Sequence, residues 1–402
     1  MPPAHGAPDD TRRVPHRPGD AMHDPSRMHH MDNLRALAML AGVLFHAALA
    51  YSPLMQPFFP TADRSNAAAV DAVIWFLHLF RMPVFFVVAG YFAARMVQRR
   101  GFGAMFRDRM LRILLPFVLF MPLVLWALSA STLHAASTVA HPSPVLQWVA
   151  QFAAMDDAPP SPPSTAHLWF LYYLMLFYVL AWVVDTLGGA RIGAFLRGLH
   201  PAGLLVALPL LLAPALAMVS APHPAPESPL PQWWALQFFG AFFALGWLLQ
   251  GHDAWFARLR PVLPWLVPAS LALHALFLHQ LSLHPPGPAN PAATWSLALL
   301  QAFTSVWMTL ACVAGARLLL AWRTPLLRYL ADASYWIYLA HLPVLFVVQY
   351  RLMDLDWHWG WKLSASIAAT LAACLASYEL LVRRTPLRRL VGGAATSPSV
   401  RG

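Results

Sequence analysis

Charged residues are scarce in this chain of 402 residues. They make up 11% of the sequence, against 59% apolar residues, whereas soluble domains carry about 25% charged residues. So little charge cannot cover a soluble surface of this size, and the composition indicates a membrane protein. The basic excess, Lys+Arg 27 against Asp+Glu 17, does not require a nucleic acid partner, because membrane proteins place Arg in short cytoplasmic loops.

Lysine and cysteine are nearly absent. Lys362 is the single lysine, and the two cysteines, Cys312 and Cys374, lie inside apolar segments. We therefore expect buried thiols, without a disulfide framework or a metal site. Residues 1–30 lack the apolar core of a signal peptide and are rich in Pro, His, Arg and Asp. We expect this stretch and residues 391–402 to be disordered tails.

Long apolar runs fill the rest of the chain. A membrane-spanning helix needs about 20 mostly apolar residues, and strands that could close a barrel are not evident. The sequence therefore predicts an all-α, polytopic membrane protein with about ten spanning helices and one membrane domain over residues 31–390. The predicted helices lie at residues 34–51, 70–94, 110–130, 167–186, 202–220, 233–250, 262–281, 294–320, 334–350 and 363–382.

Arginine alternates between successive loops. The loops that follow the second, fourth, sixth, eighth and tenth predicted helices carry Arg, whereas residues 131–166 contain none and include Asp156 and Asp157. By the positive-inside rule, the Arg-bearing loops and both termini are cytoplasmic. The sequence therefore predicts a multi-pass protein of the bacterial inner membrane.

The first predicted helix carries two polar residues, Arg35 and His46. They are 11 positions apart, close to three helical turns, so both lie on one face about 16 Å apart along the axis. Gly42 lies on the same stripe and leaves room beside it. His46 either bonds to a neighbouring helix or transfers a proton, for which imidazole is the best suited side chain near neutral pH.

The second predicted helix contains Arg81 two residues before Pro83. We expect Pro83 to kink or break the helix, and a break at membrane depth must face protein or a watery cavity. Arg81 then either holds an anion in a cavity or is neutralised by a carboxylate on another helix. Glu379 and Asp32 are the candidate partners.

The ninth predicted helix carries Ser334, Tyr338 and His341 at spacing i, i+4, i+7. This spacing places the three side chains on one helical stripe. A polar seam that holds helices together explains the stripe at least as well as a substrate-binding role.

Arg109 and Arg112 are spaced i, i+3 where a predicted helix enters the membrane. The simplest interpretation of the surrounding arginines is the positive-inside signal. However, two guanidinium groups on one side of a helix also suit phosphate, which they can bind in a bidentate fork.

These segments together resemble the acyltransferase family three of bacterial membrane acyltransferases. Four family motifs occur in order: Arg-x10-His, Arg-Met-Pro-x-Phe-Phe followed by Gly, Arg-x-x-Arg, and Ser-Tyr-x-x-Tyr-Leu-x-His. In this chain they correspond to Arg35 with His46, Arg81 to Phe86 with Gly90, Arg109 with Arg112, and Ser334 to His341. With the segment from His167 to Phe170, the chain is most similar to the branch whose member adds succinyl groups to osmoregulated periplasmic glucans. The chain departs from the family's Glu-Arg-Pro-like ending, where it has Arg383-Arg384-Thr385-Pro386.

The resemblance implies an enzyme that moves an acyl group, such as acetyl or succinyl, from cytoplasmic acyl-coenzyme A to a hydroxyl of an extracytoplasmic glycan or lipid-linked sugar. It implies catalytic roles for His46 and Arg35 and a donor-binding role for Arg109 and Arg112. It also implies that substrate contacts the cavity residues Arg81, Ser334, Tyr338 and His341. We expect no metal and no nucleic acid partner.

Two other functions are compatible with the sequence. A secondary transporter also contains broken helices and intramembrane Arg and His, although it more often shows repeated halves, which this sequence lacks. A non-catalytic membrane component of glycan assembly would tolerate the loss of His46.

Overall fold

The computed structural model describes residues 29–157, 162–198, 200–283, 290–322 and 324–392. Within these ranges every regular element is a helix, which confirms the predicted all-α class. The long helices are α1 (His29–Leu49), α2 (Ala68–Arg109), α3 (Leu115–Thr138), α5 (Trp169–Thr186), α10 (Leu263–Leu283), α11 (Pro291–Leu319), α12 (Pro325–Leu352) and α13 (Trp359–Ser377). The shorter ones are η2 (Pro53–Met55), η3 (Met110–Leu114), α4 (Pro144–Ala153), η4 (Ala166–Leu168), α6 (Ala190–Gly198), α7 (Pro201–Ala217), α8 (Trp233–Leu249), α9 (Asp253–Leu259), η5 (Tyr378–Arg383) and α14 (Arg388–Val391).

Each of the ten predicted segments falls on a helix of the structure. By length and composition, the described residues contain seven stretches that could cross a membrane, and α7 and α8 are apolar but shorter. One of the seven, residues 68–138, contains both α2 and α3. The chain is therefore an all-α membrane protein, and about ten crossings remains a prediction. The predicted tails lie almost entirely outside the described residues.

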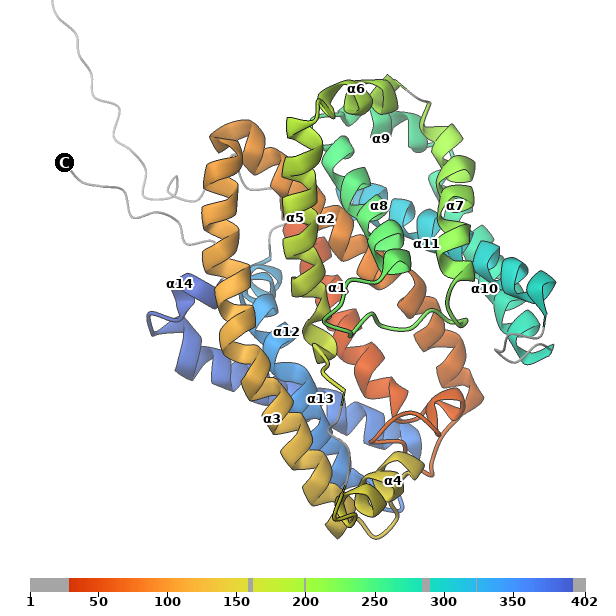
Figure 1. The fold of residues 1–402 in the computed structure, drawn as a ribbon, viewed down its shortest axis with the longest axis vertical. Coiled ribbons are helices and arrows are strands. Elements are labelled where there is room, and N and C mark those ends of the chain that lie inside the picture. Colours follow the sequence, from red (N-terminus) through yellow and green to blue (C-terminus); the bar gives the residue numbers. More distant parts are fainter. Residues whose placement is uncertain (1–28, 158–161, 199, 284–289, 323, 393–402) are drawn as a thin grey trace, which may run out of the picture.

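The chain reverses direction between α2 and α3 (Figure 1). Inside α2, Gly101 leaves the helical conformation with φ of 76°, a left-handed value that glycine adopts readily. We call this end of the molecule, where α6 and α9 also lie, the arginine end. Of the two outcomes predicted for Pro83, a kink or a break, the break is wrong, because α2 remains helical through Pro83. Helices in membranes tolerate proline when neighbouring helices satisfy the freed backbone groups.

Helices α2 and α8 cross at close range through two glycines. A Cβ atom on Gly90 would lie 2.0 Å from the carbonyl oxygen of Phe243, and one on Gly246 would lie 2.0 Å from that of Val87. No side chain fits at either position, so the two backbones pack directly, as small residues allow in membrane proteins. The crossing fixes the middle of α2, which carries Arg81.

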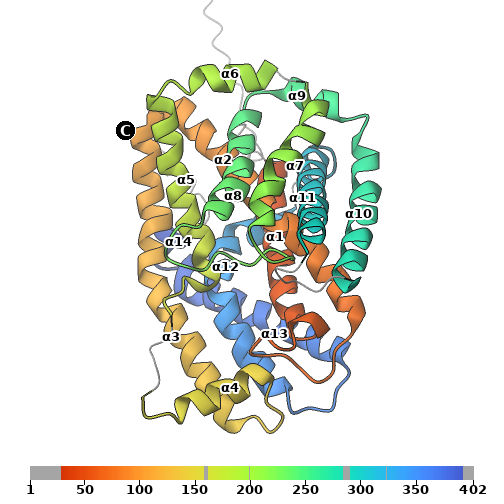
Figure 2. The ribbon, with the colours of Figure 1, turned by 45° about the vertical axis from the view of Figure 1, so that its right-hand side comes forward.

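The loop between α7 and α8 crosses the middle of the molecule, not the end that carries α4 (Figures 1 and 2). It is tied to the chain before α5, because the Thr165 amide donates a hydrogen bond of 2.8 Å to the Glu227 carbonyl oxygen. Helices α1, α2, α12 and α13 continue past this loop towards α4 (Figure 1). The loop therefore lies within the bundle and forms part of the wall of its interior.

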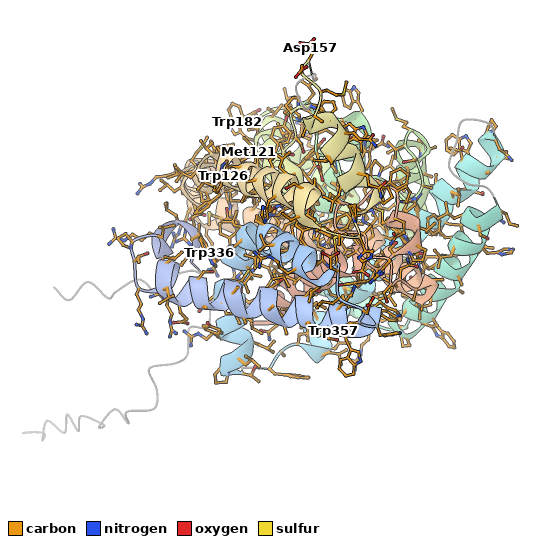
Figure 3. The ribbon with its side chains drawn as sticks, turned by 90° about the horizontal axis from the view of Figure 1, so that it is seen from below. Met121, Trp126, Asp157, Trp182, Trp336 and Trp357 are labelled. Carbon is orange, nitrogen blue, oxygen red and sulfur yellow. The ribbon has the colours of Figure 1, made fainter. Side chains whose placement is uncertain are left out.

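Large apolar side chains cover the outside of the bundle. Trp126 on α3 is 71% exposed and Trp182 on α5 is 45% exposed, and both lie on the flank that these helices form (Figure 3). An exposed apolar surface of this kind suits contact with lipid. One interior ion pair joins Lys362 to Asp63: Lys362 Nζ lies 2.7 Å from Asp63 Oδ2, with both side chains buried.

Candidate active site

A cavity of about 780 Å³ runs through the interior from the arginine end. Helices α1, α2, α5 and α12 line it, together with η3 and the loop between α7 and α8. The structure brings all eight predicted site residues to this one cavity: Arg35, His46, Arg81, Arg109, Arg112, Ser334, Tyr338 and His341. Their roles remain predictions, but their convergence from four separate parts of the chain is a finding of the tertiary structure.

Three histidines meet in the cavity. The ring centroid of His341 lies 5.3 Å from that of His46 and 5.1 Å from that of His167. These side chains come from α12, α1 and η4. Among the described residues, no group of three or more His, Cys, Asp or Glu side chains is arranged to hold a metal ion.

The hydrogen bonds of His341 determine which of its ring nitrogens can accept a proton. Its Nδ1 lies 2.8 Å from the carbonyl oxygen of Tyr338 and 3.1 Å from that of Ile337. Because a carbonyl only accepts, Nδ1 carries the hydrogen and the buried Nε2, which has no partner among the described residues, carries the lone pair. His46 is partly exposed, and its ring has no hydrogen-bond partner in the described part of the chain. Its imidazole is therefore available to a substrate.

The hydroxyl groups of Tyr338 and Ser334 both have hydrogen-bond partners. The Tyr338 hydroxyl donates a bond of 2.7 Å to the His167 carbonyl oxygen, and His167 Nε2 lies 3.1 Å from the Tyr338 carbonyl oxygen. The Ser334 hydroxyl donates to the carbonyl of Ala331 one turn earlier. A polar contact between segments thus accounts for the Tyr338 hydroxyl, whereas the Ser334 hydroxyl is satisfied within its own helix; both residues also line the cavity.

Arg81 lies in the space that Gly42 leaves on α1. Its Nη1 is 3.1 Å from where a Cβ on Gly42 would be, and its Cζ is 4.4 Å from the centroid of the Phe45 ring. The room predicted beside Gly42 is therefore occupied by a guanidinium group. Arg81 is 7% exposed, and no carboxylate pairs with it among the described residues.

The two carboxylates that we considered as partners for Arg81 bind elsewhere. Glu379 accepts a hydrogen bond of 2.8 Å from Arg383, one turn away on η5. Asp32 lies 3.8 Å from Arg35. The interpretation of Arg81 as a neutralised structural arginine is therefore wrong for these two partners.

Arg35 links α1 to α12 near the arginine end. Its Nη2 donates a hydrogen bond of 3.0 Å to the carbonyl oxygen of Ala331 and forms the ion pair with Asp32. The side chain is 36% exposed. Arg35 thus keeps part of its guanidinium accessible to the cavity while its backbone contact sets its position.

Arg109 and Arg112 converge on one carboxylate. Asp108 lies 3.5 Å from Arg109 Nη1 and 3.2 Å from Arg112 Nε. Arg112 belongs to η3, a π-helical turn of the kind that often marks functional sites. Arg109 also lies over the ring of Tyr178, with its Cζ 5.3 Å from the ring centroid. The paired arginines are thus held in the cavity wall by a local anion.

Other cavity residues were not identified from the sequence. The ring centroids of His78 and His223 lie 4.4 Å apart with the rings tilted by 35°, and His78 Nε2 lies 2.7 Å from the His223 carbonyl oxygen. His78 lies one turn before Arg81 on α2, a spacing that could have pointed to it. His223 and Glu227 lie in a Pro-rich loop without helical periodicity, so no sequence signal marked them. Burial raises the pKa of the Glu227 carboxyl, while a hydrogen bond from Ser164 opposes the shift.

Comparison with known proteins identifies the family. The acyltransferase domain family, acyltransferase family three, matches residues 28–379. The chain belongs to this family. The chain is therefore a helical membrane protein of acyltransferase family three, with histidine and arginine lining one cavity inside the helix bundle.

Several curated relatives carry the name Glucans biosynthesis protein C. They include proteins from Escherichia coli strain K12, strain SMS-3-5 / SECEC and O1:K1 / APEC. Each is 30% identical over 104 residues, which are 24% of this chain and 25% of the relative. The match therefore spans about a quarter of the length of these relatives. No solved structure matches the chain significantly.

Proposed function

We propose that the protein transfers an acyl group from a cytoplasmic acyl-coenzyme A to a hydroxyl of an extracytoplasmic glycan or lipid-linked sugar. The observation that carries this proposal is one cavity that joins the paired arginines, Arg109 and Arg112, to the histidines His46 and His341. An acyl-coenzyme A needs both features, because its phosphates require cations while its thioester must meet a base. The name of the Escherichia coli relatives supports a glucan as the acceptor.

The two ends of the cavity suit the two substrates. Besides Arg109 and Arg112, the arginine end of the cavity is lined by Arg95, Arg99, Arg100 and Arg328. Guanidinium groups bind phosphate in bidentate geometry, so this end takes the nucleotide part of the donor. The acceptor then approaches from the opposite side, past Glu227 and the loop between α7 and α8.

His46 acts as the general base in this proposal. A hydroxyl is a poor nucleophile, and removal of its proton in the transition state typically contributes about 10²- to 10⁴-fold in rate. The hydroxyl oxygen attacks the thioester carbonyl carbon while its proton moves to His46. When the carbonyl re-forms and the carbon–sulfur bond breaks, the imidazolium returns that proton to the thiolate. Arg35, nearer the arginine end, positions the donor.

The topology follows from the same assignment. The donor is cytoplasmic, so the arginine end faces the cytoplasm of a bacterial inner membrane and both termini lie inside, as the positive-inside rule predicts. Reporter fusions after Arg100 should read cytoplasmic, and fusions near Asp156 should read periplasmic. A reversed reading at either position contradicts the proposal.

Mass spectrometry tests the reaction itself. Envelope glycans from cells with and without the protein should differ by a fixed mass, which names the acyl group and the acceptor together. Purified protein with acyl-coenzyme A and that glycan should reproduce the product and release free thiol. Solute flux in vesicles without an acyl donor would instead support a transporter. Unchanged glycans and no thiol release would refute acyl transfer.

A further inference from the structure

Arg81 is a buried cation without a carboxylate partner among the described residues. Arg81 is only 7% exposed, and it lines the cavity. Its Nε has no hydrogen-bond partner among the described residues. Removing a charge from water costs several kcal/mol unless another charge or a set of hydrogen bonds compensates. In membrane proteins such a group marks a functional site. The protein therefore keeps a positive charge where a negative charge arrives only during the reaction.

The position of Arg81 relative to His46 is set by α1. Gly42, beside which the guanidinium lies, is four residues before His46, and residues at this spacing are neighbours about 5–6 Å apart on one helix face. The guanidinium also lies over the Phe45 ring, whose centroid is 5.2 Å from the centroid of the His46 ring. Hydrogen bonds of about 2.6–3.2 Å on either side would place one carbonyl carbon between the imidazole and the guanidinium.

We propose that Arg81 is a catalytic residue that binds the oxyanion of the tetrahedral intermediate. The proposal rests on the acyl transfer proposed above and adds an electrophile to its base. When the acceptor oxygen bonds to the thioester carbon, the carbonyl π electrons move onto the carbonyl oxygen. Arg81 donates hydrogen bonds to this oxygen and stays protonated. The electrons return when the carbon–sulfur bond breaks, so the arginine is unchanged after each turnover.

The position of Gly42 supports this role over simple packing. Arg81 packs closely against position 42, where a Cβ would lie 3.1 Å from Nη1 and the guanidinium would have to shift by a few tenths of an ångström to admit it. The Arg81 Cζ atom lies over the Phe45 ring, a cation–π contact that fixes the position of the guanidinium without using an N–H group as a hydrogen-bond donor. A fixed donor that needs no reorganisation during the reaction is the arrangement that best stabilises a developing charge.

The test compares kcat and KM in purified protein. Removal of one oxyanion donor typically lowers kcat by about 10²- to 10³-fold, so Arg81→Gln should show this loss with KM for both substrates unchanged. Arg81→Lys should be intermediate, because it keeps the charge but not the fork. Gly42→Ala, which shifts the guanidinium by a few tenths of an ångström without removing it, should also lower kcat. Gly315→Ala on α11 is the matched control, because a Cβ there meets nothing within 4 Å.

Chemical rescue separates catalysis from folding. Arg81→Ala should regain turnover when guanidinium ion is added, whereas His46→Gln should not. A rise in KM with unchanged kcat in Arg81→Lys and Gly42→Ala would overturn the proposal and make Arg81 a ground-state binding group. If Arg81→Gln fails to fold, the kinetics of Arg81→Lys and Gly42→Ala and the guanidinium rescue test the oxyanion role in its place. Wild-type protein that releases no thiol would refute the proposed function, whereas normal kcat in Arg81→Gln would refute only the oxyanion role.

Discussion

Replacement of His46 by glutamine tests the centre of the proposed mechanism. Glutamine keeps much of the volume and polarity of histidine but cannot take up a proton. Loss of general-base catalysis should lower kcat by about 10²- to 10⁴-fold, which corresponds to about 2.7–5.4 kcal/mol in the activation free energy. We expect this loss without a change in the affinity for acyl-coenzyme A, because the paired arginines lie at the other end of the cavity.

The structure also predicts that His46→Gln will fold. His46 makes ring contacts with Phe45 at 5.2 Å and with His341 at 5.3 Å, and no backbone group among the described residues depends on its nitrogens. Aromatic contacts are worth about 0.5–1.5 kcal/mol each, which is less than the catalytic effect. The thermal midpoint in detergent should therefore fall little.

The assay measures thiol release and acylated glycan together, with His274→Gln as control. His274 is a buried histidine on α10 whose Nε2 lies 2.8 Å from the Ala72 carbonyl oxygen; glutamine can replace this hydrogen bond. It does not line the cavity, so its variant should keep near-normal turnover. Near-normal turnover in His46→Gln would refute the base assignment. The base would then be sought first at His341, whose Nε2 is fixed as the acceptor.

Three other perturbations follow from the structure. Arg109→Ala with Arg112→Ala should weaken acyl-coenzyme A binding in a titration, with partial recovery in the lysine variants; unchanged affinity would remove the donor-binding role. Gly90→Ala would place a Cβ 2.0 Å from a backbone oxygen on α8. It should therefore destabilise the protein by about 1–3 kcal/mol or more and lower its thermal midpoint. An unchanged midpoint would contradict the close crossing of α2 and α8. Lys362→Met leaves the Asp63 carboxylate buried without its cation, which should lower the free energy of unfolding by about 3–5 kcal/mol. The double variant with Asp63→Asn should recover most of this stability. A Lys362→Met protein as stable as wild type would refute the pairing.

Local periodicity explains what sequence analysis predicted well. Apolar runs of spanning length identify helices because every backbone polar group in lipid must be satisfied within its own segment. The stripe of Arg35, Gly42 and His46 follows from the helical repeat alone. These residues do line one cavity, since a single rigid helix keeps them on one face whatever packs against it.

Glycine and proline show where local reasoning failed. Pro83 predicted a kink or a break; α2 does not break there, and its non-helical residue is Gly101. The room beside Gly42 was correctly predicted, but its occupant was not, because Arg81 lies on another helix. The helix that packs against a segment decides whether a proline breaks it and which side chain fills the space beside a glycine. The local sequence pattern does not describe that neighbouring helix.

By itself, the sequence determined that this chain is a helical membrane protein and that each motif occupies one helix face. Only the tertiary structure decided that His46 and His167 both meet His341, that no carboxylate in the described part of the chain pairs with Arg81, and that Nε2 is the accepting nitrogen of His341. The physical reason is that a helix repeat is set by bonds within one segment. Which apolar faces pack together depends on shape matching between segments, because lipid and apolar side chains offer nearly the same solvation to every such face.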